Sequence, residues 1–349
     1  MKASWKEFLI KNGAEFEADE LVSFGNPDRE RRIPPQGSVL SDLSGRGIIE
    51  VHGNDAKDFL QNQFTNDISK VTENTHQLSA WCTHKGRVIS NFRIFQRDNN
   101  YYLTVSSNLV ELIIKKLRMY VMRSDVSIED ISDSLIHFGY AGERAEQDLQ
   151  TLLGEDNIPT KPNQTLQQDS LSILRLPGTV PRFEIFGDLD DAKNLWERCN
   201  VRAATVSSNG WDYLNIVAGL PVICEASSTA WIPQMLNLQV IDGVDFQKGC
   251  YPGQEVVARL KYLGKNKRRM YRIEINSSEL PEIGQKIYAE GESAYVGKIL
   301  TTVINPTGKA EALAVLKIAL VENNLNLNQD ASNEQGSIVI LDLPYSVDE

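Results

Sequence analysis

The sequence predicts an α+β fold of two α+β units followed by a small β-barrel. Amphipathic helices and strands alternate through roughly the first two thirds of the chain. From residue 269 onward the pattern changes to short strands separated by turns, which is typical of a barrel. At 349 residues the chain is long enough for two or three domains with a sizeable core.

The first α+β unit begins with a strand over 47–52 and a helix whose apolar residues recur at helical spacing through 56–64. A second amphipathic helix follows Ser107, and strands surround both helices. This order is typical of the split βαβ pattern of ferredoxin-like domains. The other strands are expected at 78–82, 88–95, 101–105, 126–131 and 135–140.

The second α+β unit has a similar size. A helix over 143–153 is stopped by Gly154, and a polar connection over 157–170 leads to a predicted hairpin of 171–176 with 183–186. Helices are predicted over 189–199 and from 207 to 217. Residues before 40 are polar and are predicted to form an extended lead-in with one short helix.

Composition excludes several classes of function. The net charge of −11 argues against a non-specific nucleic-acid binder, although a local basic patch stays possible. No apolar run approaches the roughly 20 residues of a membrane span, and the first residues lack the apolar core of a secretory signal, so we expect a cytoplasmic protein. Four scattered cysteines and four histidines, without Cys-x-x-Cys spacing, predict reduced thiols and no metal site.

The most distinctive stretch is 248–255, which reads KGCYPGQE. Two glycines and a proline predict a shaped loop, and Cys250 lies in its middle. A cysteine is usually inert packing, but Lys248 and Arg259 nearby favour an accessible, partly ionised thiol. None of the histidines is near Cys250 in sequence to serve as a base, so a redox or cluster-handling thiol is favoured over a protease-type nucleophile.

Three other features allow both a functional and a structural interpretation. Glu255 could bind a cationic ligand or pair with Lys248. Trp211 could be core or could stack on a flat heterocycle. The third feature is a basic cluster that suits a polycarboxylate, a phosphate or RNA, or that simply forms a solvated linker; its members are Lys261, Lys265, Lys267, Arg268 and Arg269.

The stretch 248–255 resembles the K-G-C-Y-x-G-Q-E signature of the YgfZ family, which is related to the glycine cleavage T-protein, an aminomethyltransferase. In this signature loop the matching residues around Cys250 are Lys248, Gly249, Tyr251, Gly253, Gln254 and Glu255. The resemblance spans about 40 to 349. It also includes the segments 59–67, 85–87, 90–93, 214–216, 218–221, 232–234, 264–268 and 343–346.

The resemblance implies three domains around a central folate channel, with the β-barrel last. It implies binding of tetrahydrofolate, or a one-carbon derivative, and an accessory role in assembly or repair of iron–sulfur cluster enzymes, including one that methylthiolates tRNA. Cys250 is then the key thiol. The expected domains are a lead-in 1–39, a T-protein-like folate-binding core from 40–142 and 200–265, a second α+β unit 143–199, and a barrel 266–349.

Two departures refine this expectation. Trp211 matches a family tryptophan beside the folate, whereas the family's other folate-site tryptophan falls near Arg46, which could hold a folate carboxylate. The aminomethyltransferases carry an acid on the hairpin where this chain has Ser90 and Asn91, and they lack the loop cysteine. We therefore expect folate binding without glycine-cleavage activity and not a conventional enzyme. The alternatives are a folate-dependent one-carbon transferase and an RNA-binding module using 261–269.

Overall fold

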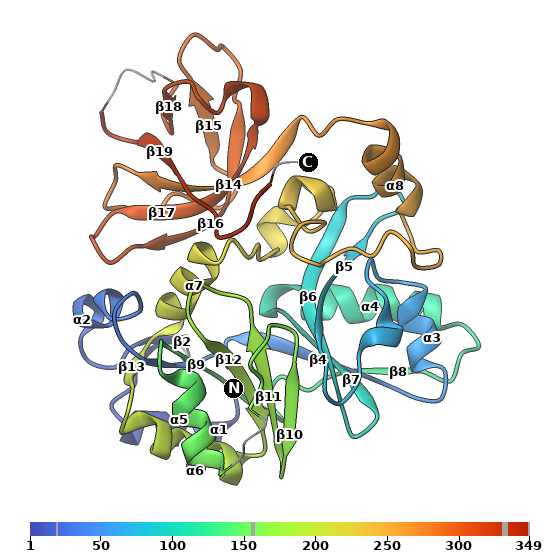
Figure 1. Ribbon diagram of the computed structural model, residues 1–349, viewed down its shortest axis with the longest axis vertical. Coiled ribbons are helices and arrows are strands. Elements are labelled where there is room, and N and C mark those ends of the chain that lie inside the picture. Colours follow the sequence, from blue (N-terminus) through green and yellow to red (C-terminus); the bar gives the residue numbers. More distant parts are fainter. Residues whose placement is uncertain (19, 155–157, 330–333, 348–349) are drawn as a thin grey trace. The chain divides into compact units, whose positions relative to one another are not determined.

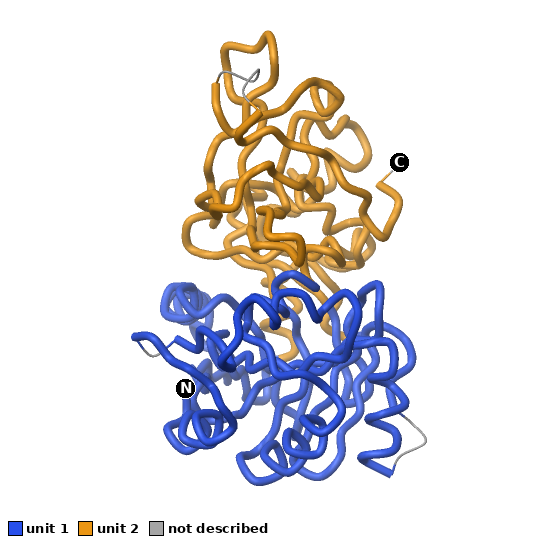
Figure 2. The backbone as a smooth tube through the Cα atoms, turned by 90° about the vertical axis from the view of Figure 1, so that its left-hand side faces the viewer, with its two compact units in different colours: residues 1–56, 70–77, 93–214 blue, residues 57–69, 78–92, 215–349 orange. Residues whose placement is uncertain are grey.

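The computed structural model describes residues 1–18, 20–154, 158–329 and 334–347. Residues 155–157 of the predicted second α+β unit, and 330–333 and 348–349 of the predicted barrel, lie outside the described residues. The described chain divides into two compact units that alternate along the sequence (Figures 1 and 2). Unit 1 contains residues 1–56, 70–77 and 93–214, and unit 2 contains 57–69, 78–92 and 215–349.

Unit 1 holds a six-stranded sheet in the order β10-β11-β12-β9-β3-β13. Among the described residues of this sheet, β13 and β3 form the parallel pair, which brings residues 204–206 beside 39–41, and the other strand pairs are antiparallel. The strands of this sheet are β3 (Val39–Asp42), β9 (Ile136–Ala141), β10 (Thr165–Gln168), β11 (Leu171–Leu176), β12 (Arg182–Gly187) and β13 (Ala204–Val206).

The N-terminal segment contributes to the core of unit 1. It forms α1 (Ala3–Lys11), the hairpin of β1 (Glu15–Glu17) with β2 (Glu20–Ser23), and α2 (Pro27–Arg32). Trp5 of α1 is completely buried against Trp196 of α6 (Leu189–Asn200). Its indole Nε1 donates to Asp42 Oδ1 over 2.7 Å, and burial raises the pKa of Asp42 to about 6. The prediction of an extended lead-in is therefore wrong, because this segment folds into helices and a hairpin and packs into the core.

The second sheet has five strands in the order β5-β6-β7-β4-β8, as the sequence pattern broadly predicts. The predicted strand over 135–140, however, is β9 of the six-stranded sheet, where it pairs with β12 and β3. Every residue of β9 is buried, which suits a central strand. The strands are β4 (Arg46–His52), β5 (Gln77–Cys82), β6 (Val88–Arg97), β7 (Asn100–Ser106) and β8 (Ser127–Asp130).

The predicted C-terminal β-barrel is confirmed and lies in unit 2 (Figure 1). Its strands close in the order β14-β17-β16-β15-β18-β19, around a core that includes Ile273, Ile287, Ile299 and Leu316. The strands are β14 (Arg268–Ile275), β15 (Lys286–Ala289), β16 (Gly297–Ile304), β17 (Ala310–Lys317), β18 (Leu325–Asn326) and β19 (Ser337–Leu341).

The remaining helices follow the predicted apolar patterns closely. The helix α4 (Val110–Val121) buries Ile113, Ile114 and Leu117 on one face. The others are α3 (Ala56–Gln61), α5 (Ala145–Leu153), α7 (Ser208–Val217) and α8 (Gln254–Leu263). The predicted connection over 157–170 includes the short strand β10. Its sequence, TLQQ, is mostly polar and therefore did not predict a strand.

Candidate functional site

The signature loop leads directly into α8 and is shaped by Gly253. This glycine has φ +83°, and a Cβ added to it would lie 2.4 Å from the carbonyl oxygen of Thr83 and 2.7 Å from Gly86. Gly86 belongs to the Lys-Gly-Arg turn between β5 and β6, and it also has a positive φ, of +69°. Only glycine permits this close approach of two backbones. Two motifs far apart in the sequence therefore meet within unit 2.

Lys248 anchors the other end of the loop. Its Nζ donates to three backbone carbonyls, those of Gln61 (2.6 Å), Phe64 (2.5 Å) and Asn66 (3.1 Å). These carbonyls lie at and just beyond the end of α3, where a helix leaves acceptors unsatisfied and favours a cation. Burial lowers the pKa of Lys248 to about 8, against the opposing effects of Asp67 and Asp245. Its ammonium thus has a structural role and does not supply the predicted partner for Glu255.

Tyr251 and Gln254 hold the middle of the loop. Tyr251 is buried, with the Lys248 Nζ 5.3 Å from its ring centroid, and burial raises the pKa of its phenol. The backbone N–H of Gln254 donates to the Tyr251 carbonyl over 3.2 Å, and its side-chain Nε2 donates to the Lys248 carbonyl over 3.4 Å. The buried Tyr251 ring and the Gln254 amide thus both contact Lys248, which keeps the shape of the loop.

Cys250 is the exposed cysteine of the loop. Cys82 and Cys199 are buried, and burial raises the pKa of each thiol to about 12, while Cys224 is half-buried. Gly249, beside Cys250, has open space where a side chain would begin. Loop residues on both sides of Cys250 are therefore fixed by packing while the thiol itself faces solvent. This contrast is the main geometric reason to regard Cys250 as the working group of the loop.

Glu255 and Arg259 line a groove on α8 with a volume of about 350 Å³. They are one helical turn apart, a spacing at which opposite charges attract. The predicted basic cluster is partly dispersed. Lys265 and Lys267 are exposed, whereas Arg268 donates to the Val296 carbonyl over 2.9 Å and so belongs to the barrel.

The two predicted cofactor-binding residues of unit 1, Arg46 and Trp211, share one partner. Glu184 on β12 lies 3.4 Å from Arg46 Nη1 and accepts from Trp211 Nε1 over 3.3 Å. Its other oxygen lies 3.4 Å from His137 Nε2 on β9. Arg46 also pairs with Asp212 over 3.1 Å. The structure thus joins Arg46 and Trp211 through a buried carboxylate.

Charge compensation dominates this cluster. Burial alone would raise the pKa of Glu184, but the adjoining His137 imidazole and the guanidinium groups of Arg46 and Arg93 outweigh it and hold that pKa well below its usual value. Burial lowers the pKa of His137, which favours its neutral form, and lowers that of Arg182 to about 9. Glu184 is therefore an ionised carboxylate inside the protein.

Trp211 is completely buried. Gly139 lies against the six-membered ring of the indole, because a Cβ there would approach three ring atoms within 2.6 to 2.7 Å. The Arg182 guanidinium lies over the same side chain, 4.8 Å from its centroid. The accessible members of the cluster are Arg46 and Asp212, which are 24% and 46% exposed. A ligand would meet those two side chains before it met the indole.

Glu184 was not singled out from the sequence. It occupies one position in the strand Arg182–Gly187, whose other residues are mostly apolar. The available signal was a pair of opposite charges, Arg182 and Glu184, spaced two apart and therefore on one face of a strand that is otherwise apolar.

The hairpin residues Ser90 and Asn91 have structural roles. Asn91 Nδ2 donates to the Pro221 carbonyl over 2.7 Å, and its Oδ1 accepts from the backbone N–H of Ile223 over 2.9 Å. Ser90 is completely buried and donates to a backbone carbonyl. Asn91 thus fastens the segment 221–223 to the hairpin within unit 2.

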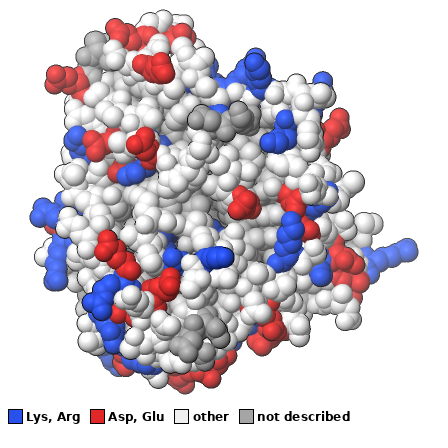
Figure 3. All heavy atoms as spheres, in the orientation of Figure 1, with Lys and Arg blue, Asp and Glu red and all other residues white. Residues whose placement is uncertain are grey.

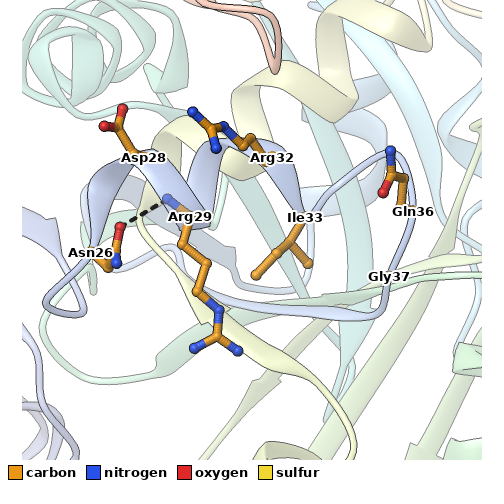
Figure 4. A pocket seen from close by; sticks show the side chains of 7 residues that line it. All are labelled: Asn26, Asp28, Arg29, Arg32, Ile33, Gln36 and Gly37. Carbon is orange, nitrogen blue, oxygen red and sulfur yellow. Dashed lines mark hydrogen bonds between the residues drawn. The ribbon is translucent and has the colours of Figure 1, made fainter.

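Two other regions bring polar side chains close together. A hollow of about 450 Å³ at α2 is lined by Arg29 and Arg32, but their guanidinium groups point in different directions and do not converge on one ligand (Figure 4). Glu50, His52 and Glu129 place potential ligand atoms within 4.8 Å of one another. One oxygen of Glu50 already accepts from Tyr102 and Asn100, and the group is partly open to solvent.

On the face shown in Figure 3, basic and acidic side chains are interspersed, so that face offers no continuous field of one sign for a nucleic-acid backbone. Among the residues that the structure describes, none of the helices combines the length and apolar character that a membrane crossing requires.

Comparison with known proteins identifies the family. Residues 14–199 match the GCVT N-terminal domain. The tRNA-modifying protein YgfZ of Klebsiella pneumoniae strain 342 is 32% identical over 329 residues, covering 93% of this chain and 97% of that protein. This chain belongs to the YgfZ family. Escherichia coli strain SE11 has a YgfZ that is also 32% identical, over 325 residues.

A solved structure extends the likeness to the whole fold. The glycine cleavage system aminomethyltransferase T of Bartonella henselae superposes with a TM-score of 0.76 over 99% of this chain and 97% of its own. At 15% sequence identity, this match shows a shared fold. The expected T-protein-like α+β fold of a YgfZ-family chain is therefore confirmed.

Proposed function

We propose that this protein is a tetrahydrofolate-binding accessory factor for the assembly or repair of iron–sulfur cluster enzymes, including one that methylthiolates tRNA, and that it acts in the cytoplasm. Cys250 is its working thiol. The observation that carries the proposal is the construction of the signature loop: Lys248 and Gly253 are fixed by backbone contacts, while Cys250 between them is exposed. The names of the curated relatives support a role in tRNA modification.

Cys250 acts together with groups from a partner. A single thiol cannot complete an iron–sulfur cluster, which usually takes four cysteine ligands. The other cysteines of the described chain are buried or half-buried, so they do not offer exposed companions to Cys250. In this proposal the partner is an iron–sulfur enzyme or carrier that brings the remaining ligands or accepts what the thiol delivers.

The residues of unit 1 fit a folate in their chemistry. Arg46 can donate to a carboxylate or a carbonyl oxygen of the ligand, and Asp212 can accept from an amino group. Glu184, which accepts from Trp211, pairs with Arg46 from the interior, and Asp212 pairs with Arg46 as well. When bound, a reduced folate supplies a carrier for one-carbon units. The protein's own contribution is to orient the ligand through Arg46 and Asp212.

A folate-dependent transferase receives less support from the same structure. Proton transfer in aminomethyl chemistry needs a positioned acid or base. Both polar atoms of the Asn91 side chain are committed to backbone partners, and Ser90 is buried. Glu255 is the carboxylate of the signature loop, and it is exposed on α8. We therefore assign folate binding to this chain without aminomethyl transfer to glycine-derived substrates.

Titration with tetrahydrofolate tests the proposal. We expect calorimetry to show binding to the parent protein, weaker binding by about tenfold or more for Arg46→Ala because a charge-assisted hydrogen bond is lost, and unchanged binding for Cys250→Ala. Circular dichroism checks that each variant is folded. The absence of binding to the parent, or equal binding by Arg46→Ala, would contradict the assignment of the folate site.

A further inference from the structure

The outer face of α8 carries an unusual set of exposed aliphatic residues. Val256, Leu260 and Leu263 recur at helical spacing and line the 350 Å³ groove together with Ile232. Val256 is 40% exposed and Leu263 is 84% exposed. The inner face of the same helix is held by Val257, which is completely buried and whose carbonyl accepts from Gln234 over 2.6 Å. The helix is thus well anchored, while Val256 and Leu263 on its outer face are exposed and Leu260 is half-buried.

Charge around this groove is opposite to that of the whole chain. From residue 255 to residue 269 there are six basic residues and one acidic residue, whereas the chain as a whole has a net charge of −11. Arg259 and the single acid of this stretch, Glu255, both line the groove, and exposed Lys261, Lys265 and Lys267 follow along the chain. A groove with an aliphatic floor and a basic rim matches an acidic segment that presents apolar side chains on one face.

The groove is also close to the working thiol along the chain. Cys250 lies four residues before the start of α8, in a loop whose shape is fixed by Gly253 at the helix N-cap. A segment seated on α8 would therefore be held next to that loop. Exposed apolar groups of this kind commonly mark interaction surfaces.

We propose that the α8 groove is the docking surface for an acidic amphipathic helix of a partner protein. The groove is lined by Ile232, Glu255, Val256, Arg259, Leu260, Leu263 and Gly264. That this partner protein is the one served by Cys250 rests on the proposed function, whereas the docking of an acidic helix in the groove does not. A protein helix fits better than RNA, because single-stranded RNA is held by aromatic stacking, and the groove floor is aliphatic.

The first test uses a fluorescein-labelled synthetic amphipathic peptide with leucines on one face and glutamates on the other. We expect the full-length protein to raise its anisotropy at low salt, and to bind a matched peptide with lysines in place of glutamates at least about tenfold more weakly. Leu263→Glu and Arg259→Glu should each weaken acidic-peptide binding about tenfold or more. Val201→Glu, at a position 87% exposed in unit 1, is the matched control and should bind like the parent.

Several results would overturn the docking proposal. Equal binding of both peptides would do so, and so would peptide binding that Leu263→Glu leaves unchanged. A third such result is a tRNA complex that competes with the peptide. That complex would be weakened by Lys265→Glu but not by Leu263→Ala. Sedimentation provides another, since a dimer of the parent that Leu263→Glu dissociates would identify a second copy as the occupant. Thermal melting of each variant separates a lost surface from a lost fold.

A second test uses a deletion strain and measures methylthiolation of tRNA. Leu263→Glu should lower the modification while Val201→Glu supports it fully, and purified Leu263→Glu should still bind tetrahydrofolate like the parent. Full activity of Leu263→Glu in cells would contradict docking of the partner served by Cys250 in this groove, and would leave the role of Cys250 intact. Full activity of Cys250→Ala, with peptide binding still dependent on Leu263, would contradict the proposed function and leave docking intact.

Discussion

Two regions of this protein satisfy their buried charges in opposite ways. Around Glu184 in unit 1, the partners are other side chains, chiefly the Arg46 guanidinium and the His137 imidazole. In the signature loop of unit 2, Lys248 is satisfied by three backbone carbonyls. In unit 1 the buried charge is balanced behind the partly exposed pair Arg46 and Asp212. In the signature loop the buried charge fixes the backbone on either side of one exposed thiol.

The largest expected effect comes from the charge-balanced region. Glu184→Gln removes the anion that compensates Arg46 and Arg182, and uncompensated buried charge is strongly destabilising. We expect the free energy of unfolding to fall by about 3 to 5 kcal/mol, measured by urea denaturation. Glu129→Gln, at an exposed position, is the control and should change it little. Equal effects of both substitutions would show that the cluster does not depend on the charge of Glu184.

A smaller effect is expected at the anchor of the loop. Lys248→Met keeps the length of the side chain but leaves the carbonyls of Gln61, Phe64 and Asn66 without their donor. We predict a loss of about 2 to 3 kcal/mol in the same assay and faster reaction of Cys250 with a thiol reagent, because the loop is released. Lys265→Met at an exposed site should do neither. Unchanged stability and thiol reactivity in Lys248→Met would refute the anchoring role.

The two glycines of the loop provide the next comparison. Gly253→Ala places a Cβ 2.4 Å from the Thr83 carbonyl oxygen at a positive φ, and we expect a cost of about 1 to 3 kcal/mol. Gly249→Ala meets open space and should change stability by less than about 0.5 kcal/mol. Equal melting temperatures for the two variants would show that the loop does not depend on the close contact with Gly86.

The smallest effect near neutral pH is the titration of Glu184. Because its pKa in the folded protein lies below the ordinary value of 4.5, the unfolded state takes up protons first as the pH falls. Its contribution to stability is therefore present above pH 4.5 and is lost as the pH falls further. Denaturation midpoints measured across this range should decline less steeply in Glu184→Gln. The same slope in both proteins would exclude a depressed pKa at this residue.

The sequence was sufficient for features that depend on local pattern. The apolar face of α4, the hairpin of β11 with β12, and the strand-turn series of the barrel all follow from periodicity and turn residues. The family signature also identified the loop around Cys250. These features can be predicted because the residues that determine them are neighbours in the chain.

Features that depend on distant residues could not be predicted in this way. The parallel pairing of β13 with β3 joins residues about 165 positions apart, and nothing in either short segment specifies the partner. The role of Lys248 depends on carbonyls at the end of α3, which offer no side-chain signal. Likewise, Glu184 becomes informative only when His137 and Arg46 are brought beside it.

We propose above all that Cys250 is the group that the signature loop presents to a partner. The most direct test is the level of methylthiolated tRNA in a deletion strain that expresses Cys250→Ala, compared with the parent and with Cys224→Ala, the half-buried cysteine, at equal protein levels. We predict that Cys250→Ala fails to restore the modification while Cys224→Ala restores it. Full restoration by Cys250→Ala would contradict the account.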